Sequence, residues 1–108
     1  MFPPDDIAEL QRKGAEVSAT LRLLANEKRL LVLCRLAIAG EMSVGALGEA
    51  VGLSQSALSQ HLAKLRADGL VATRREAQVL HYRIADPRVR RLLAALYDIY
   101  CAGPEADA

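Results

Sequence analysis

Aromatic residues are scarce in this chain, which has no Trp, one Phe and three Tyr among its 108 residues. Hydrophobic residues nevertheless make up 52% of the sequence, and these are chiefly Leu, Ala and Val. A β-sandwich is usually richer in aromatic and β-branched residues. The composition therefore predicts a mainly helical protein, and the length predicts a single domain, 1–108, with one modest core.

Long hydrophobic runs and targeting signals are also lacking. The apolar run 30–34 is closed by Arg29 and Arg35, far short of a membrane span. The N-terminal Met-Phe-Pro-Pro-Asp-Asp is acidic and does not have the layout of a signal peptide, and Phe2 excludes N-myristoylation. We therefore expect a cytoplasmic protein with no membrane partner. A stable structural disulfide between its two cysteines, Cys34 and Cys101, would be unusual in that compartment.

A large excess of one charge is the third feature that is missing, since the net charge is only +1. The basic residues are not spread evenly, however. Residues 54–83 hold five basic side chains and two acidic ones, a local excess of three positive charges. A protein of low net charge that binds a polyanion needs such a local concentration. This segment is therefore the first candidate for a nucleic-acid-binding surface.

Apolar periodicity and capping residues predict five helices and one β-hairpin. Asn26, Ser43, Ser54 and Asp86 each stand where a helix N-cap is needed. Gly14 interrupts the apolar stripe of the first helix without ending it. The predicted helices are 5–24, 27–39, 44–51, 55–68 and 87–101, and the predicted strands are 70–75 and 79–84, joined by 76–78, with 102–108 as a frayed tail.

The two short helices around Gly52, followed by the hairpin, have the order of a winged helix-turn-helix. In the second of these helices Leu58, Leu62 and Leu65 form one stripe, and the opposite face is polar. Gln can bond adenine with two hydrogen bonds, Ser can bond any base, and basic side chains bind phosphate. We predict DNA contacts by the exposed polar and basic residues of this segment: Ser54, Gln55, Ser56, Ser59, Gln60, His61, Lys64, Arg74, Arg75 and Gln78.

Other functional classes fit the sequence less well. Taken alone, 55–66 could equally be an ordinary amphipathic helix with a solvated polar face, but the preceding short helix and the basic hairpin favour DNA binding. An enzyme is not expected, because Cys34 and Cys101 lack the Cys-x-x-Cys spacing and no Gly-rich phosphate loop is present. A helical dimer that binds protein and never DNA is the remaining alternative.

Residues 36–84 resemble the winged helix-turn-helix of ArsR/SmtB-type repressors. The resemblance is carried by Ser43–Leu47, Leu53–Leu62 and Leu65–Val71, and Asn26–Leu30 is similar to that family's second-helix opening. It implies a homodimer with an interface built from helices 5–24 and 87–101. It also implies a double-stranded DNA partner with an imperfect palindrome, and an inducer that lowers DNA affinity.

Many members of the family bind metal, but both of the family's known metal sites are missing from this sequence, so we expect no metal site and no cofactor. Metal- and arsenic-sensing members carry cysteines at the start of the third helix, where this chain has Ser43 and Gly45. Another group uses Asp and His on the last helix, and here Arg88 stands where the His would follow Asp86. Asp86 is better explained as a helix cap.

From the residues alone, Cys34 and Cys101 could be either inert core residues or a redox or ligand-binding device. The first interpretation stays open because free Cys is often an inert buried residue. The contexts Val32–Leu36 and Ala95–Cys101 are similar to the BigR/SqrR-type branch of the family, which responds to persulfides. This resemblance implies that Cys34 and Cys101 act as a thiol switch for reactive sulfur species. A disulfide or polysulfide bridge between them would lower DNA affinity. The alternative is a repressor with structural cysteines and another inducer, either a general oxidant or a metal or metalloid.

Overall fold

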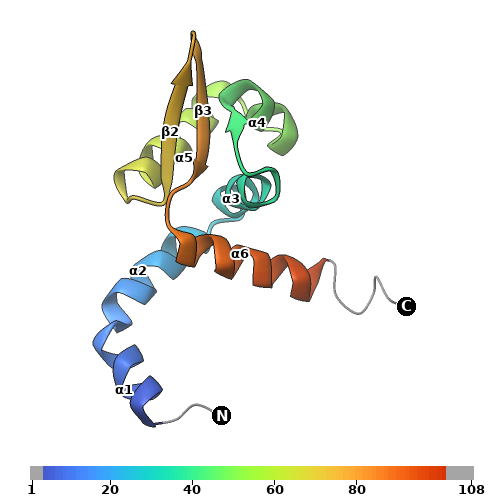
Figure 1. Ribbon diagram of the computed structural model, residues 1–108. Coiled ribbons are helices and arrows are strands. Elements are labelled where there is room, and N and C mark those ends of the chain that lie inside the picture. The colour runs from blue at the N-terminus through green and yellow to red at the C-terminus, as the bar shows by residue number, and fades with distance from the viewer. Residues whose placement is uncertain (1–3, 102–108) are drawn as a thin grey trace.

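The computed structural model describes residues 4–101, and the predicted frayed tail 102–108 lies outside the described residues. Six helices and a three-stranded sheet form a winged helix-turn-helix (Figure 1). In chain order the elements are α1 (Pro4–Arg12), α2 (Gly14–Leu24), α3 (Glu27–Ala39), β1 (Met42–Ser43), α4 (Val44–Val51), α5 (Gln55–Ala67), β2 (Val71–Glu76), β3 (Val79–Ile84) and α6 (Pro87–Tyr100).

The four predicted N-caps are confirmed. Each capping side-chain oxygen accepts a hydrogen bond from a backbone N–H two or three residues further on, which satisfies a donor that the helix leaves unpaired. The bonds are Asn26 to Arg29 (3.1 Å), Ser43 to Ala46 (3.2 Å), Ser54 to Ala57 (3.2 Å) and Asp86 to Arg88 (2.9 Å). Gly52 then ends α4 with a φ of +67°, a left-handed conformation that glycine adopts without strain. The helix-turn-helix angle therefore depends on a cap and a glycine that are both visible in the sequence.

The prediction of one continuous first helix is wrong. The helix is interrupted at Lys13, whose φ and ψ are −97° and 5°. The Lys13 N–H donates to the carbonyl oxygens of both Glu9 and Leu10, each at 3.1 Å. Gly14 follows directly, and glycine is the poorest helix former after proline. The result is an arm of two helices, α1 and α2, which extends away from the rest of the molecule (Figure 1).

The sheet has one more strand than predicted, in the order β1-β3-β2, because Met42 and Ser43 pair with Tyr82 and His81 of β3. The sequence gives little sign of a strand only two residues long. The hairpin link is also shorter than predicted, since Glu76 pairs with Val79 and only residues 77–78 form the turn.

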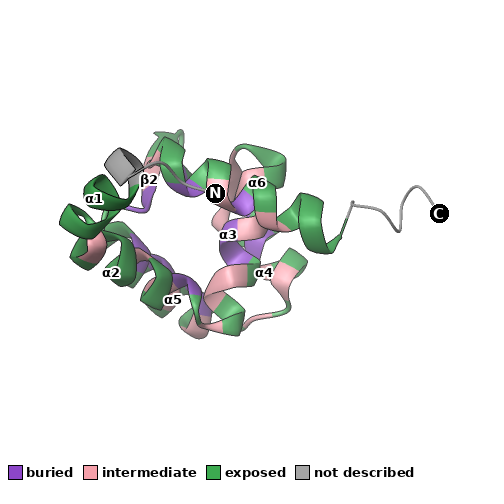
Figure 2. Ribbon diagram, turned by 90° about the horizontal axis from the view of Figure 1, so that it is seen from below, coloured by how far each residue is buried: buried purple, intermediate pink, exposed green. Residues whose placement is uncertain are grey.

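The core lies where α3, α4, α5, α6 and the sheet meet, and Figure 2 shows buried residues gathered there. The predicted apolar stripe of α5 is confirmed, because Leu58, Leu62 and Leu65 are each at most 1% exposed. By contrast, Leu24 is the one buried residue among those described in α1 and α2. The arm therefore contributes little to the core. None of the described helices is long and apolar enough to cross a membrane.

Candidate DNA interface and thiol pair

Helix α5 presents its polar residues away from the core. Leu58, Leu62 and Leu65 fix the rotation of the helix by packing inward, and this leaves the other side to solvent. Among the predicted contact residues of this segment, His61 is half-buried and the others are exposed: Ser54, Gln55, Ser56, Ser59, Gln60 and Lys64. The predicted α5 contact residues therefore lie at or near one solvent-facing surface of the helix.

Two of these side chains already have partners. The Ser54 hydroxyl accepts the capping bond, so its oxygen stays fixed at the start of α5. The Lys64 ammonium lies 3.4 Å from the Asp68 carboxylate, and both side chains are exposed. Exposed ion pairs of this kind contribute only about 0–1 kcal/mol, so a phosphate could replace Asp68 at little cost.

The wing has two faces, because successive side chains of a strand point to opposite sides of the sheet. Val71 and Ile84 are opposite each other and are 3% and 2% exposed, which identifies the face toward the core and α5. Arg75 shares the parity of Val71 and therefore belongs to this α5-facing side. Arg74 belongs to the other, outer face. The sequence motif alone does not show how the two arginines differ. The alternation of side chains along the strand places them on opposite faces of the sheet.

Arg74 is held in an ion-pair cluster on that outer face. Its guanidinium lies against the carboxylate of Glu41, with an Nη2–Oε1 distance of 2.7 Å and an Nε–Oε2 distance of 3.2 Å. A second carboxylate, that of Glu76, lies 3.4 Å from Arg74 Nη1. The hydrogen bonds from Arg74 lower the pKa of Glu41 below its usual value. Among the described residues, Arg75 has no ion-pair partner.

Sequence reasoning missed Glu41. It lies between the glycine that ends α3 and the first residue of β1, outside every motif. Met42 pairs with Tyr82 of β3. If this antiparallel register is continued by one residue, Glu41 lies beside Arg83, on the same face of the sheet as Arg74 and His81. A prediction of strand β1 would have placed Glu41 on the sheet and so revealed it as a neighbour of Arg74. Gln78, the last predicted contact, is exposed in the hairpin turn.

The two cysteines are free thiols in different surroundings. Cys34 is half-buried in α3 and lines a groove between α3 and α6, together with Ala37, Ile38, Arg90, Leu93, Ala94, Tyr97 and Asp98. Cys101 is exposed at the C-terminal end of α6, where its N–H donates to the Tyr97 carbonyl at 2.8 Å. Burial raises the pKa of the Cys34 thiol, and the nearby charge of Cys101 raises it further. The groove is thus lined by Cys34 of α3 and by α6 residues as far as Asp98, and Cys101 follows three residues further along the chain.

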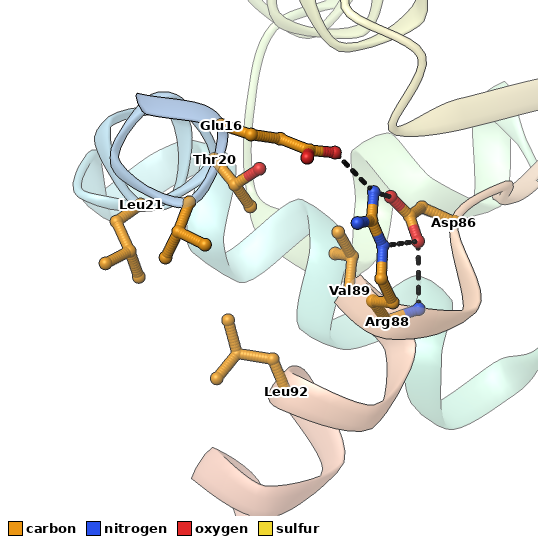
Figure 3. Close-up of a pocket in the computed structure, with 8 residues that line it drawn as sticks. Glu16, Thr20, Leu21, Asp86, Arg88, Val89 and Leu92 are labelled. Carbon is orange, nitrogen blue, oxygen red and sulfur yellow. Dashed lines mark hydrogen bonds and ion pairs between the residues drawn. The ribbon is translucent and has the colours of Figure 1, made fainter. Parts of the chain in front are cut away.

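Asp86 caps α6, and its carboxylate also forms an ion pair with the guanidinium of Arg88 (Figure 3). Arg88 Nη2 lies 2.9 Å from Asp86 Oδ2 and 2.9 Å from Glu16 Oε2, so it links α6 to α2. The hydrogen bonds from Arg88 lower the pKa of Asp86. Arg88 therefore pairs with Asp86 at the start of α6 and with Glu16 of α2. Among the side chains that the structure describes, in residues 7–101, no three His, Cys, Asp or Glu form a group that could hold a metal ion.

Comparison with known proteins identifies the family. Residues 26–73 match the family model described as bacterial regulatory protein, arsR family. The chain is 45% identical to the transcriptional activator HlyU of Vibrio cholerae, over 91% of this chain and 90% of HlyU. It is 52% identical to the nodulation protein NolR of Rhizobium meliloti, over 99% of this chain and 82% of NolR.

A solved structure agrees with the fold. The transcriptional repressor BigR of Xylella fastidiosa superposes with a TM-score of 0.81 at 38% identity, covering 89% of this chain and 97% of BigR. HlyU is named as a transcriptional activator, BigR as a transcriptional repressor and NolR as a nodulation protein, and none of the three is named as an enzyme. The winged helix-turn-helix geometry and the match over most of both chains lead to one conclusion: this chain belongs to the ArsR family of DNA-binding transcriptional regulators.

Proposed function

We propose that this protein is a homodimeric repressor that binds an imperfect palindromic operator and releases it when persulfides link Cys34 to Cys101. The observation that carries the proposal is the placement of the thiols. One lies in the groove between α3 and α6, and the other is the residue that directly follows α6, the helix that forms the other wall of that groove. A single bond between them would tie the core helix of the DNA-binding domain to the last helix.

The DNA contacts we propose are divided between α5 and the wing. The N-terminal half of α5 reads base edges in the major groove through Gln55, Ser56 and Ser59, with Gln60 beside them. Ser54, His61 and Lys64 bind the phosphates that flank the groove. Arg75 and Gln78 of the wing reach the sugar-phosphate backbone or the adjacent minor groove. Support comes from the exposure of these side chains and from the excess of positive charge in residues 54–83.

The dimer interface we propose joins the arm, α1 and α2, to α6. In the arm, Ile7, Leu10 and Leu21 are 42%, 52% and 50% exposed. In α6, Ile99 and Tyr100 are 62% and 75% exposed. Exposed apolar side chains mark interaction sites, and a second copy of this chain carries the same exposed residues on its arm and α6. A two-fold dimer would place two α5 helices to read two half-sites of a palindrome.

The switch we propose is a balanced two-electron reaction. A low-molecular-weight persulfide, RSSH, transfers its outer sulfur to one cysteine thiolate and leaves as RSH. The second thiolate attacks the modified cysteine's Sγ and expels hydrosulfide. The sum is two thiols plus RSSH giving one disulfide, RSH and hydrogen sulfide, in which the thiols are oxidised and the sulfane sulfur is reduced. With two RSSH the same scheme gives a trisulfide, two RSH and hydrogen sulfide.

We propose different parts for the two thiols in this reaction, because their exposure differs. Cys101 is exposed, so we assign it the reaction with the incoming persulfide. Cys34 is half-buried in the groove, so we assign it the second attack, within the same chain. The bridge would hold the end of α6 against α3. Since α6 belongs to the proposed dimer interface, this would change the spacing of the two α5 helices.

Intact mass spectrometry joined to a gel shift tests the proposal. The reduced protein is treated separately with glutathione persulfide and with peroxide, beside the single variants Cys34→Ser and Cys101→Ser. We expect persulfide to modify Cys34 and Cys101 with sulfur or to bridge them. DNA affinity should fall in the unsubstituted protein only. If mass and affinity stay unchanged with both reagents, the cysteines are structural and the inducer is a metal, a metalloid or another small molecule. A full response to peroxide alone would assign the switch to general oxidants.

A further inference from the structure

The wing carries two adjacent arginines with opposite surroundings. Arg75 lies on the α5-facing side of the sheet and has no ion-pair partner among the described residues. Arg74 lies on the outer face, where Glu41 binds it through two nitrogens at 2.7 and 3.2 Å and Glu76 lies at 3.4 Å. A phosphate that approached Arg74 would have to displace Glu41 and would meet two carboxylates. Like charges at such distances repel, so this face is a poor phosphate site.

The partner of Arg74 comes from a distant part of the chain. Glu41 follows Gly40, which ends α3, and it is 33 residues away from Arg74 in the sequence. Their ion pair therefore joins the end of α3 to the middle of β2, across β3. The neighbouring strand β1 is only two residues long and supplies few backbone hydrogen bonds of its own. A bidentate arginine–carboxylate contact is directional as well as attractive, so it can fix the orientation of the parts that it connects.

We propose that Glu41 and Arg74 are positioning residues that hold the wing against the end of α3, and that Arg75, not Arg74, makes the phosphate contact. This inference rests on the proposed docking of α5 and the wing on DNA. It also assigns a function to Glu41, which no sequence motif contains. Since α3 carries Cys34, the same ion pair connects the segment that directly follows the thiol-bearing helix to the wing.

The dependence of DNA affinity on salt separates a positioning residue from a phosphate contact. Removing one phosphate contact lowers the slope of log affinity against log salt by about 0.9, whereas a misplaced wing weakens binding without that signature. The variants are Glu41→Gln, Arg74→Gln, their double, the charge-reversed double Glu41→Arg/Arg74→Glu, and Arg75→Gln. Affinity for a short mixed-sequence DNA duplex is measured by fluorescence anisotropy over a salt series, and thermal melting confirms that each variant is folded.

We expect Glu41→Gln and Arg74→Gln each to weaken binding by about fivefold, the size of an exposed but bidentate ion pair. The salt slope should stay that of the unsubstituted protein. The double variant should be no weaker than either single one, and charge reversal should restore part of the affinity. Arg75→Gln should instead reduce the slope by about 0.9 for each protomer, or about 1.8 for the proposed dimer.

The inference is overturned if Arg74→Gln reduces the slope as Arg75→Gln does while Glu41→Gln strengthens binding, because Arg74 is then a phosphate contact that Glu41 inhibits. It is also overturned if neither Glu41→Gln nor Arg74→Gln changes affinity. If Arg75→Gln alone has no effect, the proposed phosphate contact by the wing fails, while a non-additive Glu41–Arg74 pair still supports the positioning function. The two failures are thus distinguishable.

Discussion

The helix-turn-helix body and the terminal helices of this protein are built in opposite ways. In the body, leucines such as Leu47 and Leu62 are at most 1% exposed, and every helix begins at a side-chain cap. In the arm, Leu10 and Leu21 are about half exposed, and the junction at Lys13 has no side-chain cap. The body buries most of its leucines within one chain, whereas the described part of the arm buries only Leu24. Helix α6 stands between the two, because it buries Val89 and Leu93 but leaves Ile99 and Tyr100 exposed. This difference is what a self-contained DNA-reading unit attached to a dimerisation unit requires.

Paired leucine truncations give the largest expected effect. Leu62→Ala should lower the free energy of unfolding by about 2–5 kcal/mol, because it leaves a cavity in a fully packed core. Leu21→Ala should have a much smaller effect at low protein concentration, since Leu21 is 50% exposed. Urea denaturation at several protein concentrations measures both. Only the Leu21→Ala effect should grow with concentration, as it would for an interface residue. Equal, concentration-independent losses would contradict the contrast between body and arm.

A charge placed on α6 tests the proposed dimer. Ile99→Asp should convert the dimer to a folded monomer, because it puts a carboxylate into an apolar interface. DNA affinity should then fall by about tenfold or more, since the two half-sites are no longer bound together. Sedimentation velocity and gel shifts measure the two effects. Val79→Asp is the matched control, because Val79 is 45% exposed but lies on the wing. A monomer from Val79→Asp, or an intact dimer from Ile99→Asp, would place the interface elsewhere.

Two glutamine substitutions, one in α5 and one in α1, test which of the two regions recognises the DNA bases. Gln55→Ala should relax the preference at particular base pairs by about 1–3 kcal/mol, because it removes a bidentate hydrogen bond to adenine. Gln11→Ala, an exposed glutamine of α1, should leave the preference unchanged. Selection of bound sequences from a random DNA pool measures both preferences. An altered preference in Gln11→Ala with none in Gln55→Ala would show that α5 does not read the bases.

Two glycines give the smallest expected effects, with opposite signs. Gly52→Ala should destabilise the protein by about 1 kcal/mol, because alanine is strained at a φ of +67°. Gly14→Ala should be neutral or stabilising by a few tenths of a kcal/mol to about 1 kcal/mol, since its φ is ordinary and no atom lies within 4 Å of the added Cβ. Thermal melting and helix content by circular dichroism measure both. A destabilising Gly14→Ala would mean that the break at Lys13 is required by the fold.

The sequence predicted the body well, because its signals are local. Ser54, the leucine stripe and Gly52 lie within one or two turns of the structures that they determine. The winged helix-turn-helix order was therefore predicted correctly, together with both long strands of the sheet to within one residue at each end. The two-residue strand β1 was missed because so short a segment has no periodicity.

The features that sequence reasoning could not supply depend on contacts between distant residues. Glu41 meets Arg74 only because β1 joins the sheet beside β3, and this separates Arg74 from its neighbour Arg75. The link from Arg88 to Glu16 spans 72 residues in the same way. The pairing of Cys34 with Cys101 is implied by family resemblance alone and stays a prediction, although Cys34 lines the groove between α3 and α6 and Cys101 directly follows α6.

The most direct test of the central claim is the DNA affinity of the protein and its cysteine variants before and after glutathione persulfide. Fluorescence anisotropy with an operator selected from random DNA provides the dissociation constants. We predict that persulfide weakens binding by the unsubstituted protein and leaves Cys34→Ser and Cys101→Ser unchanged, and that a reductant restores the affinity. Equal loss of affinity in all three proteins, or no loss in the unsubstituted one, would contradict the thiol switch.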